Sequence, residues 1–126
     1  LFDIKSPRVV MAGAHVDIED YEMFITDFSS FVFDFAYLCR PVLYFVPDYG
    51  QFKAGMNHYR ELDLPFEKAF GPLVLDPDGA VEEIKKVAEN GFDPEPIYAE
   101  RMRNFYYPLE NCAEALYNEV SSWDCL

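Results

Sequence analysis

Two adjacent hydroxyl side chains, Ser29 and Ser30, stand between two apolar stretches, Met23–Thr26 and Phe31–Cys39. If the first stretch is a strand and the second a helix, the serines lie where the free N–H groups of the first helical turn face the carboxyl edge of a sheet. Those N–H groups and the positive end of the helix dipole favour an anion, by about 0.3–1 kcal/mol at an exposed helix start. The spacing therefore predicts a phosphate site, although a serine in this position is also an ordinary helix cap.

Charged residues extend this candidate site. Asp34 follows Ser30 by four residues, so the two share a face of the predicted helix, where the carboxylate can meet ligand hydroxyls or a neighbouring backbone amide. Asp27 lies between the predicted strand and the serines. Arg60 lies in a long loop expected near the same edge of the sheet, and its guanidinium suits a phosphate contact. We therefore predict that Asp27, Ser29, Ser30, Asp34 and Arg60 bind the substrate.

Composition excludes several kinds of partner and site. The chain has 126 residues and a formal net charge of -13, which opposes binding to nucleic acids and to anionic lipid headgroups. Its 51% hydrophobic content suits a globular core, but no apolar run approaches the roughly 20 residues of a membrane span. The number and spacing of the cysteines indicate neither a disulfide framework nor a metal site, which fits a reducing cytoplasm; they are Cys39, Cys112 and Cys125.

The elements that must position the serines alternate along the chain. Strands are predicted at Val9–Met11, Met23–Thr26, Val42–Val46 and Pro72–Leu75. Helices are predicted as a turn or two over Asp17–Glu22, a buried helix that starts at Ser29 or Ser30 and runs over Phe31–Cys39, and three later helices over about 80–89, 97–106 and 109–122. Tyr49–Phe70 should be a long, partly helical loop. This order predicts an α/β fold with a parallel sheet and helical crossovers.

One stretch resembles a known family. Ile25–Ala36 and the following Arg40–Phe45 resemble the Thr-Asp-Tyr-Ser-Ser, Phe-Asp-Tyr-Ala and Lys-Pro signature of the CDP-glycerol glycerophosphotransferases, which build teichoic acid and related capsule polymers. Phe28 and Phe35 stand in place of the tyrosines, and Arg40 in place of the lysine. Weaker similarity continues through Gly71–Val74 and Val81–Ile84, so that about residues 9–120 are covered.

The resemblance implies an architecture and an activity. The family is similar in fold to two-domain GT-B glycosyltransferases with Rossmann-like halves, so residues 1–126 would form the C-terminal, donor-binding part of one domain. The whole enzyme would transfer glycerol phosphate or ribitol phosphate from a CDP-alditol such as CDP-glycerol to a hydroxyl of a polymer or lipid-linked acceptor. It would release CMP with no cofactor and no obligatory metal. Ser29 and Ser30 match the positions that hold the donor phosphate, and Asp34 matches the acidic position of the motif.

The catalytic base is expected outside this chain. The family's Arg-x-His-Pro element lies upstream of its Ser-Ser loop, and no His-Pro dipeptide occurs here. We therefore expect the base before Leu1, in a missing N-terminal part of the same protein, and no turnover by the chain alone. His15 and His58 are interpreted as surface or capping residues. The whole enzyme would be cytoplasmic and peripheral on the inner face of the bacterial plasma membrane, held there by parts outside this chain.

Two other functions stay open at this stage. The same α/β fold would serve a noncatalytic nucleotide-binding or interaction domain. A phospho-receiver-like regulatory domain would require a carboxylate cluster after the first strand, and Val9–Gly13 supplies none. Fold resemblance alone does not establish chemistry, so the residues of the site must distinguish between these functions.

Overall fold

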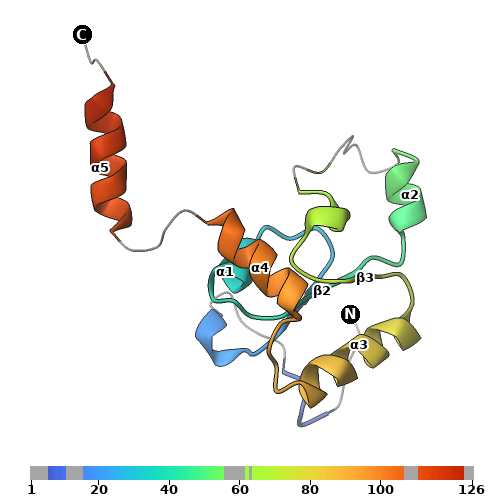
Figure 1. Cartoon of the computed structure of the whole chain (residues 1–126). Coiled ribbons are helices and arrows are strands. Elements are labelled where there is room, and N and C mark those ends of the chain that lie inside the picture. The colour runs from blue at the N-terminus through green and yellow to red at the C-terminus, as the bar shows by residue number, and fades with distance from the viewer. Residues whose placement is uncertain (1–5, 11–15, 56–61, 63, 107–110, 124–126) are drawn as a thin grey trace.

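The described part of the chain contains a three-stranded parallel sheet (Figure 1). The computed structural model describes residues 6–10, 16–55, 62, 64–106 and 111–123. The strands are β1 (Phe24–Thr26), β2 (Val42–Phe45) and β3 (Leu73–Val74), in the order β1-β2-β3. Tyr44 pairs with Thr26 on one side and with Leu73 on the other. The predicted α/β fold with a parallel sheet is confirmed.

Helices precede, separate and follow the strands along the chain. They are the 3-10 helices η1 (Ile18–Asp20) and η2 (Phe66–Lys68) and the α-helices α1 (Val32–Tyr37), α2 (Tyr49–Lys53), α3 (Pro77–Glu89), α4 (Pro96–Phe105) and α5 (Cys112–Ser122). α1 contacts β1, β2 and α4, whereas α3 contacts β2 and β3. α5 stands apart from the sheet near the C-terminus (Figure 1), and none of its residues is buried. No described helix is long and apolar enough to cross a membrane.

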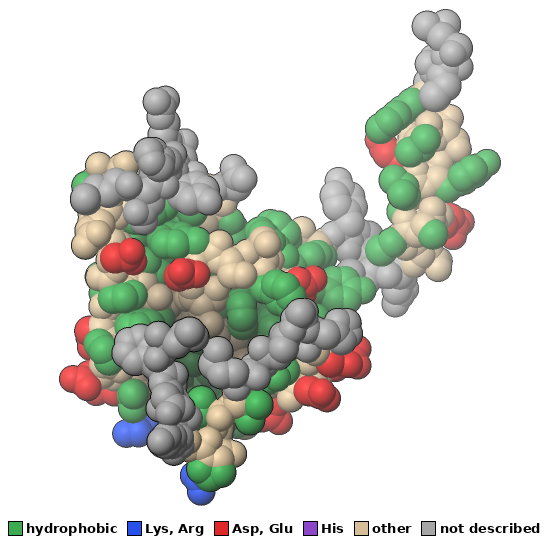
Figure 2. Space-filling view, turned by 180° about the vertical axis from the view of Figure 1, so that it is seen from behind, with side chains coloured by type: hydrophobic (Ala, Val, Ile, Leu, Met, Phe, Trp, Pro, Cys, Tyr) green, Lys and Arg blue, Asp and Glu red, His purple; other side chains and the backbone are tan. Residues whose placement is uncertain are grey.

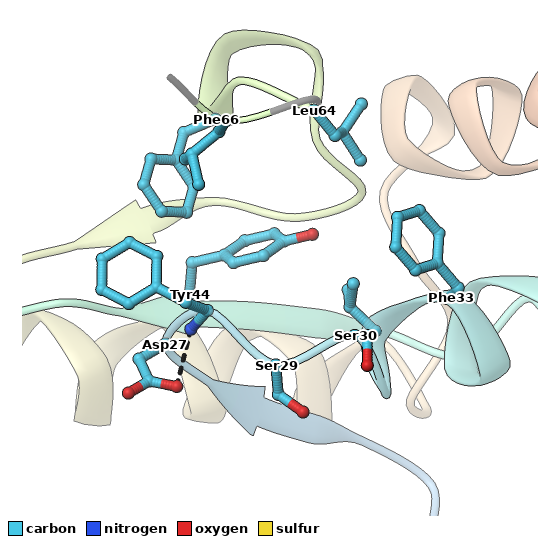
Figure 3. Close-up of a pocket in the computed structure, with 10 residues that line it drawn as sticks. Asp27, Ser29, Ser30, Phe33, Tyr44, Leu64 and Phe66 are labelled. Carbon is cyan, nitrogen blue, oxygen red and sulfur yellow. Dashed lines mark hydrogen bonds between the residues drawn. The ribbon is translucent and has the colours of Figure 1, made fainter. Parts of the chain in front are cut away.

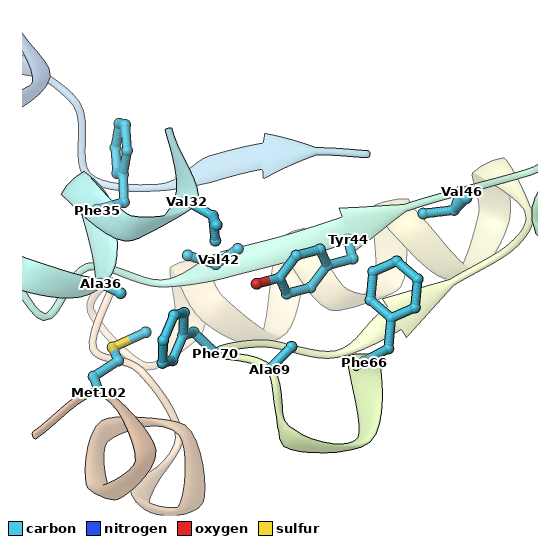
Figure 4. Close-up of a cluster of buried hydrophobic side chains, with 10 residues drawn as sticks. All are labelled: Val32, Phe35, Ala36, Val42, Tyr44, Val46, Phe66, Ala69, Phe70 and Met102. Carbon is cyan, nitrogen blue, oxygen red and sulfur yellow. The ribbon is translucent and has the colours of Figure 1, made fainter. Parts of the chain in front are cut away.

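The main core lies beside β2 (Figure 4). Val42, Tyr44 and Val46 occupy alternate positions along β2 and its end, and all three are buried in one cluster. They pack with Phe70 and Met102, each of which is only 1% exposed. Because Phe70 precedes β3 and Met102 belongs to α4, this cluster ties the sheet to the C-terminal half of the fold.

Helix α1 is shorter and more exposed than the sequence predicts. Cys39 adopts a left-handed conformation with φ 54°, and its N–H donates to the Ala36 carbonyl at 3.0 Å. The Arg40 N–H then donates to the carbonyl of Phe35 at 2.9 Å, which closes the helix. The predicted buried helix is therefore wrong in part, because Phe31 and Tyr37 lie on the outer face and are 47% and 53% exposed.

The first predicted strand, Val9–Met11, is wrong over its described residues. Val9 and Val10 are not in a strand, and Val10 is 83% exposed. A short run of β-branched residues becomes a strand only when a neighbouring strand bonds to it, and neither valine has such a neighbour among the described residues. Met11 lies outside the described residues.

Helix α3 begins three residues earlier than Ala80, the predicted start. The Asp76 carboxylate caps it by accepting the Gly79 N–H at 2.9 Å, and Pro77 occupies the first turn. The cap is therefore Asp76 alone, and Pro77, Asp78 and Gly79 belong to the helix. The predicted α4 is confirmed, and the first residues of the predicted last helix, 109–110, lie outside the described residues.

Gly71 has no room for a side chain. A Cβ at this position would lie 1.8 Å from the Val42 carbonyl oxygen. Gly71→Ala should therefore force β2 and the chain entering β3 apart, and lower the free energy of unfolding by roughly 3 kcal/mol or more in urea denaturation. Gly50→Ala is the matched control, because no atom lies within 4 Å of that Cβ, and it should change stability by at most about 1 kcal/mol. Equal unfolding midpoints for the two variants would contradict the close contact at Gly71.

Candidate functional site

A hollow of about 200 Å³ opens beside the carboxyl end of β1 (Figure 3). We call it the serine-loop pocket, and it is lined by Asp27, Phe28, Ser29, Ser30, Val32, Phe33, Tyr44, Leu62, Leu64 and Phe66. One wall is the loop between β1 and α1, and the other comes from the connection between β2 and β3, with Tyr44 of β2 between them. The pocket thus lies where open parallel sheets usually bind their ligands.

Hydrogen bonds show how the serine loop enters α1. The Ser29 Oγ accepts the Phe31 N–H at 3.2 Å, and the Ser29 carbonyl accepts the Val32 N–H at 3.3 Å. The Ser30 carbonyl accepts the Phe33 N–H at 3.1 Å. The chain therefore makes a tight turn first, and α1 begins at Val32 and not at Ser29 or Ser30. Because this turn engages the first helical N–H groups, the expectation that they are free to bind an anion is wrong.

The remaining donors lie on the serines themselves. Among the described residues, the backbone N–H groups of Ser29 and Ser30 have no hydrogen-bond partner. The Ser30 hydroxyl is exposed and also has no partner there, while the Ser29 hydroxyl keeps its proton to donate because its bond to Phe31 uses it as an acceptor. Two amides and two hydroxyls on adjacent residues are thus available to an oxyanion at the pocket.

The predicted charged residues are only partly brought together. Asp27 lines the pocket, and its carboxylate accepts the N–H of Phe28 at 2.6 Å (Figure 3). Asp34 is exposed and does not line the pocket. It lies near Tyr106, where burial and, to a smaller extent, the charge of Asp34 raise the pKa of the tyrosine hydroxyl. Arg60, like both histidines, lies outside the described residues.

An aromatic wall forms the part of the site that sequence reasoning missed. Phe28 stacks on Phe52 with ring centroids 4.6 Å apart, and Phe66 meets Tyr44 edge to face at 5.2 Å. Tyr44 is 5% exposed, and burial raises its pKa to about 12, so its hydroxyl keeps its proton at neutral pH. A tyrosine inside a strand of buried residues is typical of a core position, and no signal in the sequence marks it as part of a pocket.

The electrostatics of the pocket are those of a binding site with neutral donors. Among the described residues, Asp27 is the one charged residue of the lining, and neither Lys nor Arg contributes to it. Figure 2 shows acidic side chains spread over one face of the molecule, with Lys and Arg visible only near one end. The described residues contain no group of His, Cys, Asp or Glu that could hold a metal ion. The geometry therefore suits a ligand with an oxyanion at the serines and an uncharged, flat part against the aromatic wall.

Comparison with known proteins gives consistent matches. The model of a family described as CDP-Glycerol:Poly(glycerophosphate) glycerophosphotransferase matches residues 5–122. The Teichoic acid poly(glycerol phosphate) polymerase of Bacillus subtilis (strain 168) is 43% identical over 81 residues, which are 60% of this chain and 10% of the relative. The Minor teichoic acid biosynthesis protein GgaB of the same strain is 30% identical over 102 residues, which are 79% of this chain and 11% of that protein.

A third relative extends the pattern to another species. The Teichoic acid poly(glycerol phosphate) polymerase of Bacillus spizizenii (strain ATCC 23059 / NRRL B-14472 / W23) is 39% identical over 77 residues, which are 57% of this chain and 19% of the relative. The chain thus spans between a tenth and a fifth of the length of these curated relatives. No solved structure matches the chain.

The two serines should differ in their effect on stability. Ser29→Ala removes the acceptor of the Phe31 N–H and should lower the free energy of unfolding by about 0.5–2 kcal/mol. Ser30→Ala is the matched control and should leave stability unchanged, because its hydroxyl has no partner among the described residues. Thermal and urea unfolding of both variants would measure this, and an equal loss in the two would refute the loop geometry.

Proposed function

The chain belongs to the CDP-Glycerol:Poly(glycerophosphate) glycerophosphotransferase family, and from this premise we propose that it is the C-terminal, donor-binding part of such a transferase. The whole enzyme moves glycerol phosphate, or ribitol phosphate, from a CDP-alditol to a hydroxyl of a polymer or lipid-linked acceptor in teichoic acid synthesis. The names of the relatives, which include two poly(glycerol phosphate) polymerases, support a role in this class of polymer synthesis.

The observation that carries the proposal is the group of donors on Ser29 and Ser30. Both serines line a pocket at the carboxyl edge of the sheet, and their amides and hydroxyls are not engaged by an acceptor among the described residues. Neutral N–H and O–H donors at fixed positions bind phosphate oxygens well, and such bonds strengthen when the acceptor is charged. In the proposed enzyme this group holds the diphosphate of the donor.

The reaction requires a base and charge stabilisation as well as binding. The acceptor oxygen attacks the phosphorus that bears the alditol, its proton passes to the base, and the bond from that phosphorus to the CMP oxygen breaks. Donors at the serines stabilise negative charge that develops on the phosphate oxygens. We assign the base to a part of the enzyme outside this chain, since the sequence contains no His-Pro dipeptide of the kind that the family resemblance leads us to expect upstream of the serines.

The proposed enzyme has a second domain facing this one, as in the two-domain GT-B architecture. Residues 1–126 then form part of its donor-binding domain, and the acceptor approaches from the facing half. Attachment to the inner face of the plasma membrane would come from other parts of the enzyme. The small share of each relative that this chain matches, at most 19%, is compatible with such a division.

Replacing both serines in the whole transferase tests the donor site. Ser29→Ala with Ser30→Ala removes two hydroxyl donors to a charged group, each worth about 1.5–3 kcal/mol, so donor affinity or turnover should fall at least tenfold. CDP-glycerol kinetics below and above saturation would measure the loss. The single substitution Ser30→Ala best separates binding from stability, because it should weaken donor binding without lowering the melting temperature. Variants that melt earlier but keep normal kinetics when folded would leave the serines as caps and refute the site.

The chain without the rest of the transferase should show no turnover. The 126 residues supply donors for the phosphates but, in this proposal, no base. Incubation of the purified chain with CDP-glycerol and acceptor should release no CMP above the rate of a protein-free blank, while circular dichroism confirms that the chain is folded. Release of CMP by the chain alone would overturn the assignment of the base to another part of the enzyme.

A further inference from the structure

The hydroxyl of Tyr44 is a buried polar group with no hydrogen-bond partner in the described part of the chain. Its oxygen exposes less than 1 Å² to solvent. The nearby backbone amide of Phe70 partly offsets the rise in the pKa of Tyr44, but an N–H is a donor and cannot accept the hydroxyl proton. Buried polar groups in native proteins are nearly always bonded, so the bonding partner of this proton is to be sought outside the described chain.

The fold itself does not require this hydroxyl. The ring of Tyr44 packs in the core cluster and meets Phe66 at 5.2 Å between centroids, and a phenylalanine would fill the same space. By contrast, the hydroxyl of Tyr106 donates to the Phe33 carbonyl and so supports the packing of the segment after α4 on α1. The two tyrosines therefore form a natural pair, in which one hydroxyl has a structural role and the other has none.

The hydroxyl of Tyr44 is directed toward a ligand space. In Figure 3 it points into the region bordered by Ser30, Phe33 and Leu64, all of which line the serine-loop pocket. Leu62 and Leu64 belong to the connection between β2 and β3, line the same pocket and are half-buried. A ligand that displaces them reaches the hydroxyl from the pocket.

The walls of the pocket define the chemistry of what reaches Tyr44. Phe28, Phe33 and Phe66 present aromatic surface, and the described part of the lining contains no cation that would balance a buried negative charge. An uncharged, flat ring that carries a hydrogen-bond acceptor fits these walls and the protonated hydroxyl. In a CDP-alditol the cytosine ring has these properties, whereas the phosphates carry charge and the alditol is neither flat nor aromatic.

We propose that the serine-loop pocket holds the cytosine ring of the donor and that the Tyr44 hydroxyl donates a hydrogen bond to an acceptor on that ring. This inference rests on the proposed function, since it places the nucleoside of the same donor whose phosphates bind at Ser29 and Ser30. It makes Tyr44 a residue that distinguishes a pyrimidine nucleotide from a simple alditol phosphate.

Binding measurements on the whole transferase test it. Tyr44→Phe should raise the Kd for CMP and for CDP-glycerol by the same factor, roughly three- to tenfold, and leave the Kd for glycerol 3-phosphate unchanged. Its melting temperature without ligand should equal or exceed that of the unmodified protein, because an unpaired buried hydroxyl is removed. Tyr106→Phe, the matched control, should melt earlier and bind CMP normally, because Tyr106 does not line the pocket.

Four other outcomes of these measurements would contradict the inference. Unchanged CMP binding by Tyr44→Phe, with tight binding by the unmodified protein, would overturn this inference and leave the proposed function intact. A loss confined to glycerol 3-phosphate would overturn the placement of the ring. A clear drop in the melting temperature of Tyr44→Phe without ligand would show that the hydroxyl has a partner within the protein. Failure of the unmodified transferase to bind either CMP or CDP-glycerol would overturn the inference together with the proposed function.

Discussion

Strand β2 is hydrogen-bonded along both edges, to β1 and to β3, and the rest of the structure depends on that pairing. A parallel strand in this position has to be covered on both faces, and Val42, Leu43 and Tyr44 are accordingly 3%, 0% and 5% exposed. The contact of Gly71 with the Val42 carbonyl shows how closely the neighbouring chain approaches. Because β2 is fixed on all sides, the loop that leaves β1 and the connection from β2 to β3 meet beside it, and the pocket is a consequence of strand pairing.

The shortness of α1 explains why the free hydrogen-bond donors near its start lie on the serines. A helix that runs only over Val32–Tyr37 has a weak macrodipole, and its first N–H groups are engaged by the turn at Ser29 and Ser30. The helix dipole therefore contributes little at this helix start, and the amides and hydroxyls of the two serines are the main groups that could bind an anion there. This arrangement gives Ser29 two roles, since its oxygen holds the turn while its proton stays available to a ligand. The Ser30 hydroxyl makes no such bond within the described residues, so in the proposed site it serves the ligand alone.

The sequence predicts the parallel sheet and the place of the two serines after β1, but not the aromatic side of the pocket. Runs of β-branched and aromatic residues located β1 and β2 correctly, yet a similar run at Val9–Met11 misled, because composition cannot supply a strand partner. The spacing of four residues predicts Asp34 on the same face as Ser30. In the structure Asp34 is exposed and does not line the pocket, because the spacing cannot tell which way that face turns. Tyr44 could not be identified, because the missing partner of its hydroxyl is a property of the tertiary structure.

The acidity of the chain is compatible with a phosphate ligand only if most of the acidic side chains lie away from the residues that contact the phosphate. Charges in water interact by about 1 kcal/mol at 4 Å, and salt screens them beyond roughly 8–10 Å, so most of the net charge of -13 has little effect on an anion held at the serines. Asp27 is the exception, because it lines the same pocket. In the proposed transferase, cations that offset Asp27 and the donor phosphates come from outside the described lining of the pocket, and Arg60 stays a predicted contact of this kind. The described lining of the pocket then recognises its ligand through neutral hydrogen bonds and aromatic surface.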